Sequence, residues 1–262
     1  MDKRKALALI IEAIENIARQ KGLSIVIVRD FYDHELDFFG CIEDYNYKRV
    51  KNFPNTVLKI KWKTFDEYLG SLKSHYRCKI RKNMAGAERK GMETEIISDL
   101  SFSSSTVQKL WQNVYDQAKD YKREFLREDF FSNMHKYLKE KARMILFRKE
   151  SVLRGFALVL LDDDTLRYMF TGLDYDYNKD LGVYLNSLYS VIKMAIDEGK
   201  KDVDMGITAY FPKTDVGAKV VNMNVYMKHF NTVLNPLMAF AFTKMTPVFN
   251  YDSKTVFKGE AE

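Results

Sequence analysis

Three predicted β-strands follow one another with almost no sequence between them. Met144–Lys149, Val152–Leu161 and Thr165–Thr171 are rich in apolar and β-branched residues, and only Glu150-Ser151 and Asp162–Asp164 separate them. Turns this short allow neighbouring strands to pair only in the antiparallel sense, because a parallel connection needs a long crossover. The sequence therefore predicts an antiparallel meander at the centre of the fold.

The remaining periodicity places helices and further strands on both sides of this meander. The expected helices are residues 3–21, a helix that opens at Thr64 and ends near Gly86 or Gly91, and residues 106–121, 127–141 and 181–198. The expected additional strands are residues 24–28, 56–62, 92–97, 202–205 and 220–229. This irregular order predicts an α/β (α+β) fold with a mixed, mainly antiparallel sheet flanked by helices. With four prolines and no linker-like stretch, one domain over residues 1–262 is expected.

The ends of the chain carry apolar stretches that resemble targeting segments only superficially. Near the start, Glu12 and Glu15 interrupt the apolar run at helical spacing, which indicates an amphipathic surface helix. Near the other end, Pro236 and Pro247 break a stretch that is also too short to span a bilayer. No membrane span and a cytoplasmic location are therefore expected. The sequence leaves the oligomeric state open.

Positive charge is concentrated in one short segment. Between Lys73 and Lys90 there are seven basic residues and one acid, Glu88, whereas the whole chain carries a net charge of +6. A local patch of this kind predicts an anionic ligand. Arg77 and Arg81 are one helical turn apart and can address the same phosphate or carboxylate, so they are candidates for binding an anionic acceptor. Aromatic residues do not interleave with the patch, which disfavours nucleic acid as the partner.

The stretch after the meander has the character of a phosphate site. A helix is expected to begin next to Gly182, where free backbone N–H groups could hold phosphate oxygens. Gly182 would let a phosphate approach closely because it has no Cβ atom, and Lys179 adds a cation nearby.

Three motifs, in order along the chain, resemble those of a known enzyme branch. The first is Tyr68–Lys82, with its Arg-rich "YR..IRK" segment. The second runs from Gly172-Leu173-Asp174-Tyr175 to Val203-Asp204-Met205-Gly206, and the third joins Lys213–Ala218 to Tyr226–His229. Together they resemble the FemAB-like, peptidoglycan-biosynthesis branch of the GNAT acyltransferase superfamily, over about residues 60–245.

That resemblance implies a thioester donor, either acyl-CoA or a phosphopantetheine on an acyl carrier protein. Its pantetheine arm would lie along Met169, Phe170 and Thr171, beside a strand that splays from its neighbour. Its phosphates would lie on Lys179 and on the helix start, formed by Leu181, Gly182, Val183, Tyr184 and Leu185. Tyr184 stands where the usual GNAT loop has a small residue, which also admits an aminoacyl-tRNA donor as in Fem-type enzymes.

The candidate catalytic residues are Asp204, Lys213 and Tyr226. Asp204 follows a predicted strand and could act as a base or as a structural cap. Lys213 matches the lysine of the resembling family and could stabilise an oxyanion or hold an acceptor carboxylate. Tyr226 could protonate the leaving group. Cys78 lacks a His and acid at a telling spacing, and no metal pattern is present in the sequence.

The function expected from these observations is direct transfer of an acyl group from a thioester donor to an amine-type small-molecule acceptor. Two alternatives remain open at this point. One is Fem-type transfer from aminoacyl-tRNA, and the other is a non-catalytic binding module on a GNAT scaffold.

Overall fold

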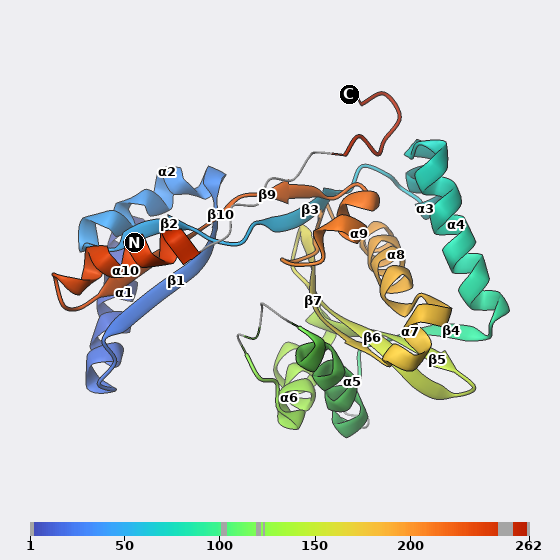
Figure 1. Cartoon of the computed structure of the whole chain (residues 1–262), viewed down its shortest axis with the longest axis horizontal. Coiled ribbons are helices and arrows are strands. Elements are labelled where there is room, and N and C mark those ends of the chain that lie inside the picture. Colours follow the sequence, from blue (N-terminus) through green and yellow to red (C-terminus); the bar gives the residue numbers. More distant parts are fainter. Residues whose placement is uncertain (1–2, 101–103, 119–121, 123, 246–253, 261–262) are drawn as a thin grey trace. The chain divides into compact units, whose positions relative to one another are not determined.

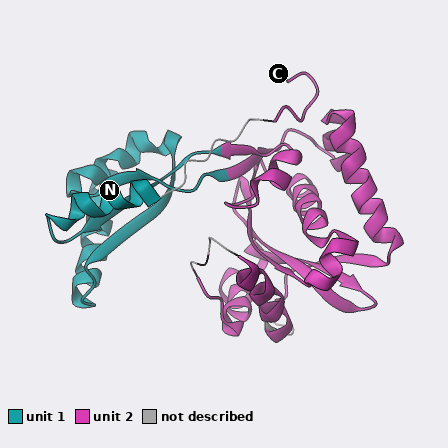
Figure 2. Ribbon diagram, viewed as in Figure 1, with its two compact units in different colours: residues 1–55, 221–251 teal, residues 56–220, 252–262 magenta. Residues whose placement is uncertain are grey.

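The computed structural model describes residues 3–100, 104–118, 122, 124–245 and 254–260. The chain divides into two compact units, Met1–Asn55 with Val221–Tyr251 (unit 1) and Thr56–Val220 with Asp252–Glu262 (unit 2), as Figure 2 shows. A compact unit need not be an independently folding domain, so the single domain expected over residues 1–262 stays a prediction.

Unit 2 is built on a mixed, mainly antiparallel sheet. The spatial order of its strands is β4-β5-β6-β7-β8-β3-β9. β5 to β7 form the predicted antiparallel meander, and β4 adds an antiparallel strand beside β5. β8 continues the sheet parallel to β7, and β3 then pairs antiparallel with β8. The strands are β3 (Asn55–Lys59), β4 (Met92–Ile97), β5 (Ala142–Lys149), β6 (Val152–Leu161), β7 (Thr165–Leu173), β8 (Asp202–Asp204) and β9 (Lys219–Val221).

Helices cover both faces of this sheet (Figure 1). Side chains alternate along β6, so that Ala157 and Val159 join the core under α8 while Phe156 and Leu158 join the core under α5 and α6. One face carries α3 (Phe65–Ser71), α4 (Ser74–Arg89), α7 (Tyr175–Leu181), α8 (Val183–Asp197) and α9 (Tyr210–Asp215). The other carries α5 (Ser104–Gln117), α6 (Glu128–Leu138) and the 3-10 turn η3 (Lys139–Lys141).

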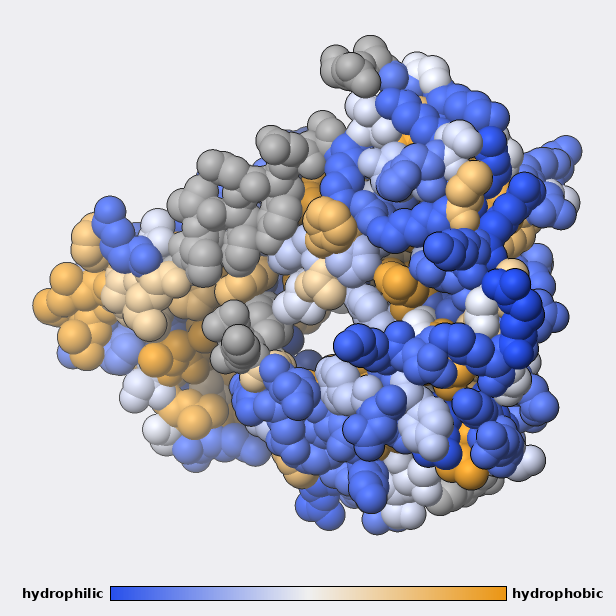
Figure 3. Space-filling model, turned by 45° about the vertical axis from the view of Figure 1, so that its right-hand side comes forward, coloured by the Kyte–Doolittle hydropathy of each residue, from blue (hydrophilic) through white to orange (hydrophobic). Residues whose placement is uncertain are grey.

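Unit 1 is a small three-stranded antiparallel sheet with helices. Its strand order is β1-β10-β2, with β1 (Ile25–Tyr32), β2 (Lys48–Lys51) and β10 (Met223–His229). The helical elements are α1 (Lys3–Gln20), η1 (Asp33–Glu35), α2 (Leu36–Phe39), η2 (Gly40–Tyr45) and α10 (Leu234–Met245). α10 packs on β2 and β10 yet leaves Leu237 and Phe240 exposed, and Figure 3 shows apolar surface on this unit.

The predicted GNAT-like α/β architecture is confirmed, with differences in detail. Thr64 caps α3 as its spacing predicts, since its side chain accepts a hydrogen bond from the Glu67 amide at 3.1 Å. The single helix expected from there to Gly86 or Gly91 is wrong: Leu72 adopts extended backbone angles and separates α3 from α4. The pattern also gave no indication of α7, α9 and α10. The last residues of the expected helix 106–121 and Pro247 lie outside the described residues.

No helix in the part of the chain that the structure describes is both long and apolar enough to cross a membrane. The cytoplasmic location stays a prediction.

Candidate active site

The sheet of unit 2 opens between β7 and β8. Parallel pairing between the two strands ends at Arg167 and Asp204, and in the described residues the rest of β7 pairs with β6 alone. At the same level the β6–β7 register shifts, so that Leu158 faces Phe170, Val159 faces Tyr168, and Met169 is a bulge residue. A bulge leaves a main-chain group out of the ladder and re-aims its neighbours, which is frequent beside active sites. The splayed strand expected at Met169–Thr171 is therefore present.

A tight loop follows β8 and faces this opening. Gly206 has a φ of 73°, and a Cβ atom built there would lie 3.7 Å from the carbonyl oxygen of Tyr168 on β7. Thr208 and Ala209 also have positive φ values, 67° and 45°. Left-handed backbone at a β-branched residue is strained and persists only where the surroundings impose it. The loop of residues 206–209 is thus held in an unusual shape next to the diverging strands.

Lys213 on α9 is hydrogen-bonded to the main chain of this loop. Its side chain is 4% exposed, and its Nζ atom donates to the carbonyl oxygens of Gly206 at 3.0 Å and Ile207 at 2.9 Å. Burial lowers the pKa of Lys213 to about 7, against an opposing effect from the nearby Asp204 carboxylate. Near neutral pH a large fraction of this amine is therefore uncharged, which is unusual for a lysine.

Asp204 is engaged in structural contacts on both of its oxygens. Its Oδ1 accepts from the Gly206 amide at 3.0 Å, which closes the turn after β8. Its Oδ2 forms an ion pair at 3.0 Å with Arg167 on β7. Thr56 on β3 adds a hydrogen bond to the carbonyl oxygen of Gly206 at 2.6 Å. Asp204 is therefore placed to shape the loop and to act on Lys213 through its charge. Its role as a base stays a prediction.

The start of α8, where phosphates were expected, is already hydrogen-bonded. Gly182 joins α7 to α8 with a φ of 61°, and the Asn178 side chain accepts from the Tyr184 amide at 3.0 Å. The side chain of Asn186 binds the carbonyl oxygens of Leu181 and Gly182, each at 3.1 Å. Leu181 and Val183 are buried. A phosphate that accepted a hydrogen bond from the Tyr184 amide would have to displace the Asn178 side chain.

The other residues named for the donor lie around this junction. Lys179 is in the last turn of α7 and is exposed. Leu185 belongs to the first turns of α8 and packs against the main core of unit 2.

The residues named for the pantetheine arm lie on β7. Met169 is 40% exposed, and Phe170 packs toward α6. The Thr171 hydroxyl donates to the Phe156 carbonyl oxygen at 2.9 Å. Binding of CoA or phosphopantetheine by these residues stays a prediction.

The structure separates the two arginines proposed for the acceptor. Arg77 is half-buried and donates to the carbonyl oxygen of Leu72 at 2.8 Å, so it closes the α3–α4 junction. Arg81 is exposed one turn further along α4. Tyr226 lies in the other unit, fully buried and in edge contact with Phe31. The catalytic role of Tyr226 and the acceptor roles of both arginines stay predictions.

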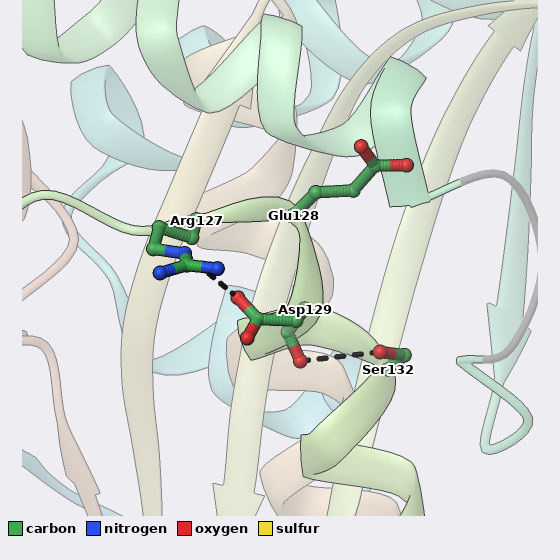
Figure 4. Close-up of a pocket in the computed structure, with 4 residues that line it drawn as sticks. All are labelled: Arg127, Glu128, Asp129 and Ser132. Carbon is green, nitrogen blue, oxygen red and sulfur yellow. Dashed lines mark hydrogen bonds and ion pairs between the residues drawn. The ribbon is translucent and has the colours of Figure 1, made fainter.

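A surface pocket lies at the first turn of α6 and includes none of the residues predicted for the site. It is lined by Arg127, Glu128, Asp129 and Ser132 (Figure 4). Arg127 pairs with Asp129 at 3.4 Å, and Glu128 points away from both. Acids in the first turn are what a helix start favours by itself. Within the described ranges no group of His, Cys, Asp and Glu could hold a metal ion.

The family follows from the sequence profile that this chain matches. A family named FemAB-like and described as "Peptidogalycan biosysnthesis/recognition" matches residues 1–214. The chain belongs to the FemAB-like family. This confirms the resemblance that the three motifs indicate.

Relatives and solved structures extend this assignment. Two curated proteins of Mycobacterium tuberculosis strains, both named putative 8-amino-7-oxononanoate synthase 2, are 27% identical over 233 residues, and the match covers 87% of this chain and 30% of their length. The chain therefore spans under a third of these relatives. Among solved structures, FemX has a TM-score of 0.64 at 12% identity, covering 90% of this chain and 79% of FemX.

Two further structures share the fold of this FemAB-like chain. The C-terminal domain of a putative lysylphosphatidylglycerol synthetase from Agrobacterium fabrum has a TM-score of 0.59 at 11% identity, covering 90% of this chain and 75% of that domain. L-PGS from Bacillus licheniformis has a TM-score of 0.57 at 14% identity, with 91% and 77% covered. At these identities the likeness establishes the fold.

Several residues of the candidate site were missed from the sequence. Arg167 gave one usable signal, a lone cation within an otherwise apolar strand pattern. The strained backbone at Thr208 and Ala209 gave none, because nothing in those residue types favours positive φ. Asn178 was missed because the helix α7 that carries it was read as loop.

Proposed function

We propose that this FemAB-like chain transfers an aminoacyl group from an aminoacyl-tRNA to an amine of a peptidoglycan-type peptide acceptor. The observation that carries the proposal is the buried amine of Lys213, held beneath the strained loop where β7 and β8 diverge. The family description points to peptidoglycan as the acceptor class. The lysylphosphatidylglycerol synthetase among the structures of shared fold is named for a lipid that carries an amino acid.

Lys213 has the chemistry of a general base for this reaction. An uncharged amine has two N–H donors and one lone pair, and the two donors suffice for the carbonyl oxygens of Gly206 and Ile207. The lone pair then remains to accept a proton. A base works best when its pKa lies near the working pH, and burial brings the pKa of Lys213 to about 7.

The reaction then balances in two proton transfers. The acceptor amine attacks the ester carbonyl carbon of the donor, the new C–N bond forms, and the proton lost by nitrogen passes to Nζ of Lys213. The C–O bond to the tRNA breaks, and Lys213 returns the proton to the departing sugar oxygen. The bulge at Met169 lies where the strands open, and a main-chain N–H left out of a ladder is the kind of donor that stabilises a transient oxyanion.

The geometry at α8 favours this donor over CoA. Pyrophosphate binding at a helix start needs free backbone N–H groups, but the amide of Tyr184 is bound by Asn178 and the neighbouring Val183 is buried. An aminoacyl ester requires no pyrophosphate site at this helix. Beyond Arg167, β7 has no ladder pairing with β8 among the described residues, so this stretch of strand is the place proposed for the aminoacyl chain.

A transfer assay with competing donors tests the proposal. Purified protein would be incubated with a muramyl peptide acceptor and either tRNA charged with a mixture of radiolabelled amino acids or radiolabelled acetyl-CoA. Label in the peptide from charged tRNA alone, abolished by prior treatment with ribonuclease, supports the proposal. Label from acetyl-CoA, or from neither donor, contradicts it.

The variant Asn178→Ala separates the two donors further. Removing the Asn178 side chain frees the Tyr184 amide. In a CoA-dependent enzyme this would raise the rate of transfer from acetyl-CoA, whereas in a tRNA-dependent enzyme it would leave the rate of transfer from charged tRNA unchanged. We expect no gain of acetyl-CoA-dependent transfer in this variant.

A further inference from the structure

Helix α4 presents a row of basic side chains on its outer face. Arg81, Lys82 and Arg89 are exposed, whereas Ile80 and Ala87 on the opposite side are buried. Eight residues of helix separate Arg81 from Arg89, a rise of about 12 Å. The row is therefore long enough to meet more than one phosphate of a nucleic acid strand.

The basic segment divides into anchored cations and outward-facing ones. Four side chains have partners within the protein: Lys73 with Thr255 at 2.9 Å, Arg77 with the Leu72 carbonyl at 2.8 Å, Lys79 with Asp215 at 2.6 Å and Lys90 with Asp180 at 2.5 Å. Arg81 and Lys82 have no such partner among the residues the structure describes. Within the described ranges, Arg89 donates only to the carbonyl oxygen of Ala85 in its own helix, at 3.2 Å.

The outward-facing cations of α4 outnumber its acids, so this row keeps a net positive charge. Glu88 is the one acid in the sequence of α4. Asp215 is occupied by Lys79 and Lys254, and Asp180 by Lys90. Figure 3 brings the side of unit 2 that carries α4 forward and shows a predominantly hydrophilic surface there. The outer face of α4 is thus a positive surface, and the ion pairs of Lys79 and Lys90 attach the helix to the rest of unit 2.

This surface is attached directly to the candidate active site. The ion pair between Lys79 and Asp215 joins α4 to α9, and Asp215 follows Lys213 by two residues on that helix. Asn83 donates to the Tyr189 hydroxyl at 3.0 Å and fixes α4 to α8, beside which α4 runs in Figure 1. A ligand bound on α4 would therefore be held in a fixed relation to Lys213.

We infer that the outer face of α4, formed by Arg81, Lys82 and Arg89, binds the phosphate backbone of double-helical RNA in the donor. This inference rests on the proposed function and names the surface that holds its tRNA. Duplex RNA is recognised mainly through shape and backbone contacts, and needs no aromatic stacking. The lack of interleaved aromatic residues, which counts against a single strand, is compatible with a duplex.

An anionic membrane fits this surface less well. A membrane-binding helix combines basic side chains with large apolar ones that enter the lipid. The exposed positions of α4 carry none of the latter, since its other exposed residues are Ser74, His75, Cys78, Ala85 and Glu88.

The test uses the full chain and a fluorescent, uncharged RNA hairpin, with binding followed by anisotropy at several salt concentrations. The double variant Arg81→Glu/Lys82→Glu is expected to weaken binding at least tenfold. Its slope of log affinity against log salt is expected to fall by about two, since about one contact is lost per residue. The matched control Lys109→Glu/Lys141→Glu makes the same charge change at exposed positions on α5 and η3, and is expected to bind nearly as wild type does.

Equal weakening in both double variants would overturn the inference, because only net charge would then matter. Wild-type affinity in the α4 variant would overturn it too, provided circular dichroism shows both variants folded. Binding to phosphatidylglycerol vesicles that depends on Arg81 and Lys82, without RNA binding, would assign the surface to a membrane instead.

The transfer assay distinguishes this inference from the proposed function. If the α4 variant raises KM for charged tRNA and leaves kcat intact, both stand. If charged tRNA supports transfer in wild type and variant with the same KM, the surface is wrong and the function holds. If the wild type neither binds the hairpin nor uses charged tRNA, both are wrong.

Discussion

The side-chain amine of Lys213 donates to the carbonyl oxygen of Gly206 at 3.0 Å, and this bond joins helix α9 to the loop that follows β8. Lys213 is almost fully buried, and Gly206 is the first residue of a loop with left-handed backbone at three positions. The contact therefore couples an amine of unusual pKa to the shape of the opening between β7 and β8.

Replacing Lys213 by Met is expected to change how stability depends on pH. Burial lowers the pKa of Lys213 to about 7 from an ordinary 10.5, so between these values the unfolded chain binds a proton that the folded chain does not. Stability must then rise with pH across that window, by at most roughly 1.4 kcal/mol per pH unit from this group. Urea denaturation at pH 6.5 and 9.5 should show this rise in wild type, and a smaller rise in Lys213→Met. Equal pH dependence in the two proteins would contradict the lowered pKa.

Gly206→Ala is expected to reduce both stability and transfer. The left-handed φ of 73° disfavours alanine, although a Cβ atom would have room, and about 1 kcal/mol of folding free energy should be lost. A shift of the Gly206 carbonyl also disturbs Lys213. Gly199→Ala is the matched control, with φ of 64° and open space at the end of α8. It should lose similar stability and keep its transfer rate; equal loss of transfer in both variants would show a global effect.

Asp204→Asn is expected to shift the pH profile of transfer toward lower pH. The Asp204 carboxylate raises the pKa of Lys213 against the effect of burial, so neutralising it should lower that pKa further. Asparagine can still accept the hydrogen bond from the Gly206 amide. The dependence of kcat/KM on pH in wild type and variant measures the shift. An unchanged acidic limb would mean that Asp204 does not act on the titrating group.

Gly172→Ala is expected to destabilise the core without involving the site. A Cβ atom at Gly172 would lie 2.1 Å from Cε1 of Phe156, and overpacking of this kind costs roughly 1–3 kcal/mol. Gly70→Ala in α3 meets nothing within 4 Å and has no positive φ, so it should be neutral or gain up to about 1 kcal/mol. Thermal or urea unfolding of both variants checks the contrast, and a neutral Gly172→Ala would contradict the packing.

The sequence predicted helices and strands well where the hydrophobic periodicity and the turn-forming residues indicate the same boundaries. β4 and β6 begin and end as predicted, because apolar alternation and short acidic or glycine-containing turns mark both ends. The break between α3 and α4 was missed because Leu72 and Lys73 carry no helix-breaking residue. A tertiary contact interrupts the helix there, because Leu72 is fully buried and forms a β-bridge with Phe257 from the far end of the sequence.

The candidate site was predictable only in part for a similar reason. Lys213 and Asp204 were found by their position in family-like motifs, and the splayed strand at Met169 was expected from the same resemblance. The contacts that bury Lys213 and lower its pKa join residues of β3, β7, β8 and α9. These residues are far apart in the sequence, so no local hydrophobic periodicity could predict that they meet. The blocking of the α8 start by Asn178 likewise depends on α7, whose seven residues are too few to give a clear helical period.

The most direct test of Lys213 as the base is the pH dependence of the transfer rate in a single turnover, with the protein in excess of the charged tRNA. If Lys213 is the base, the rate rises through pH about 7 and then levels, and the Lys213→Met variant is about 100-fold slower or more and lacks this limb. Because the acceptor titrates identically with both proteins, the limb that disappears belongs to Lys213. A rate that falls above pH 7, or a limb that survives in Lys213→Met, would contradict Lys213 as the base.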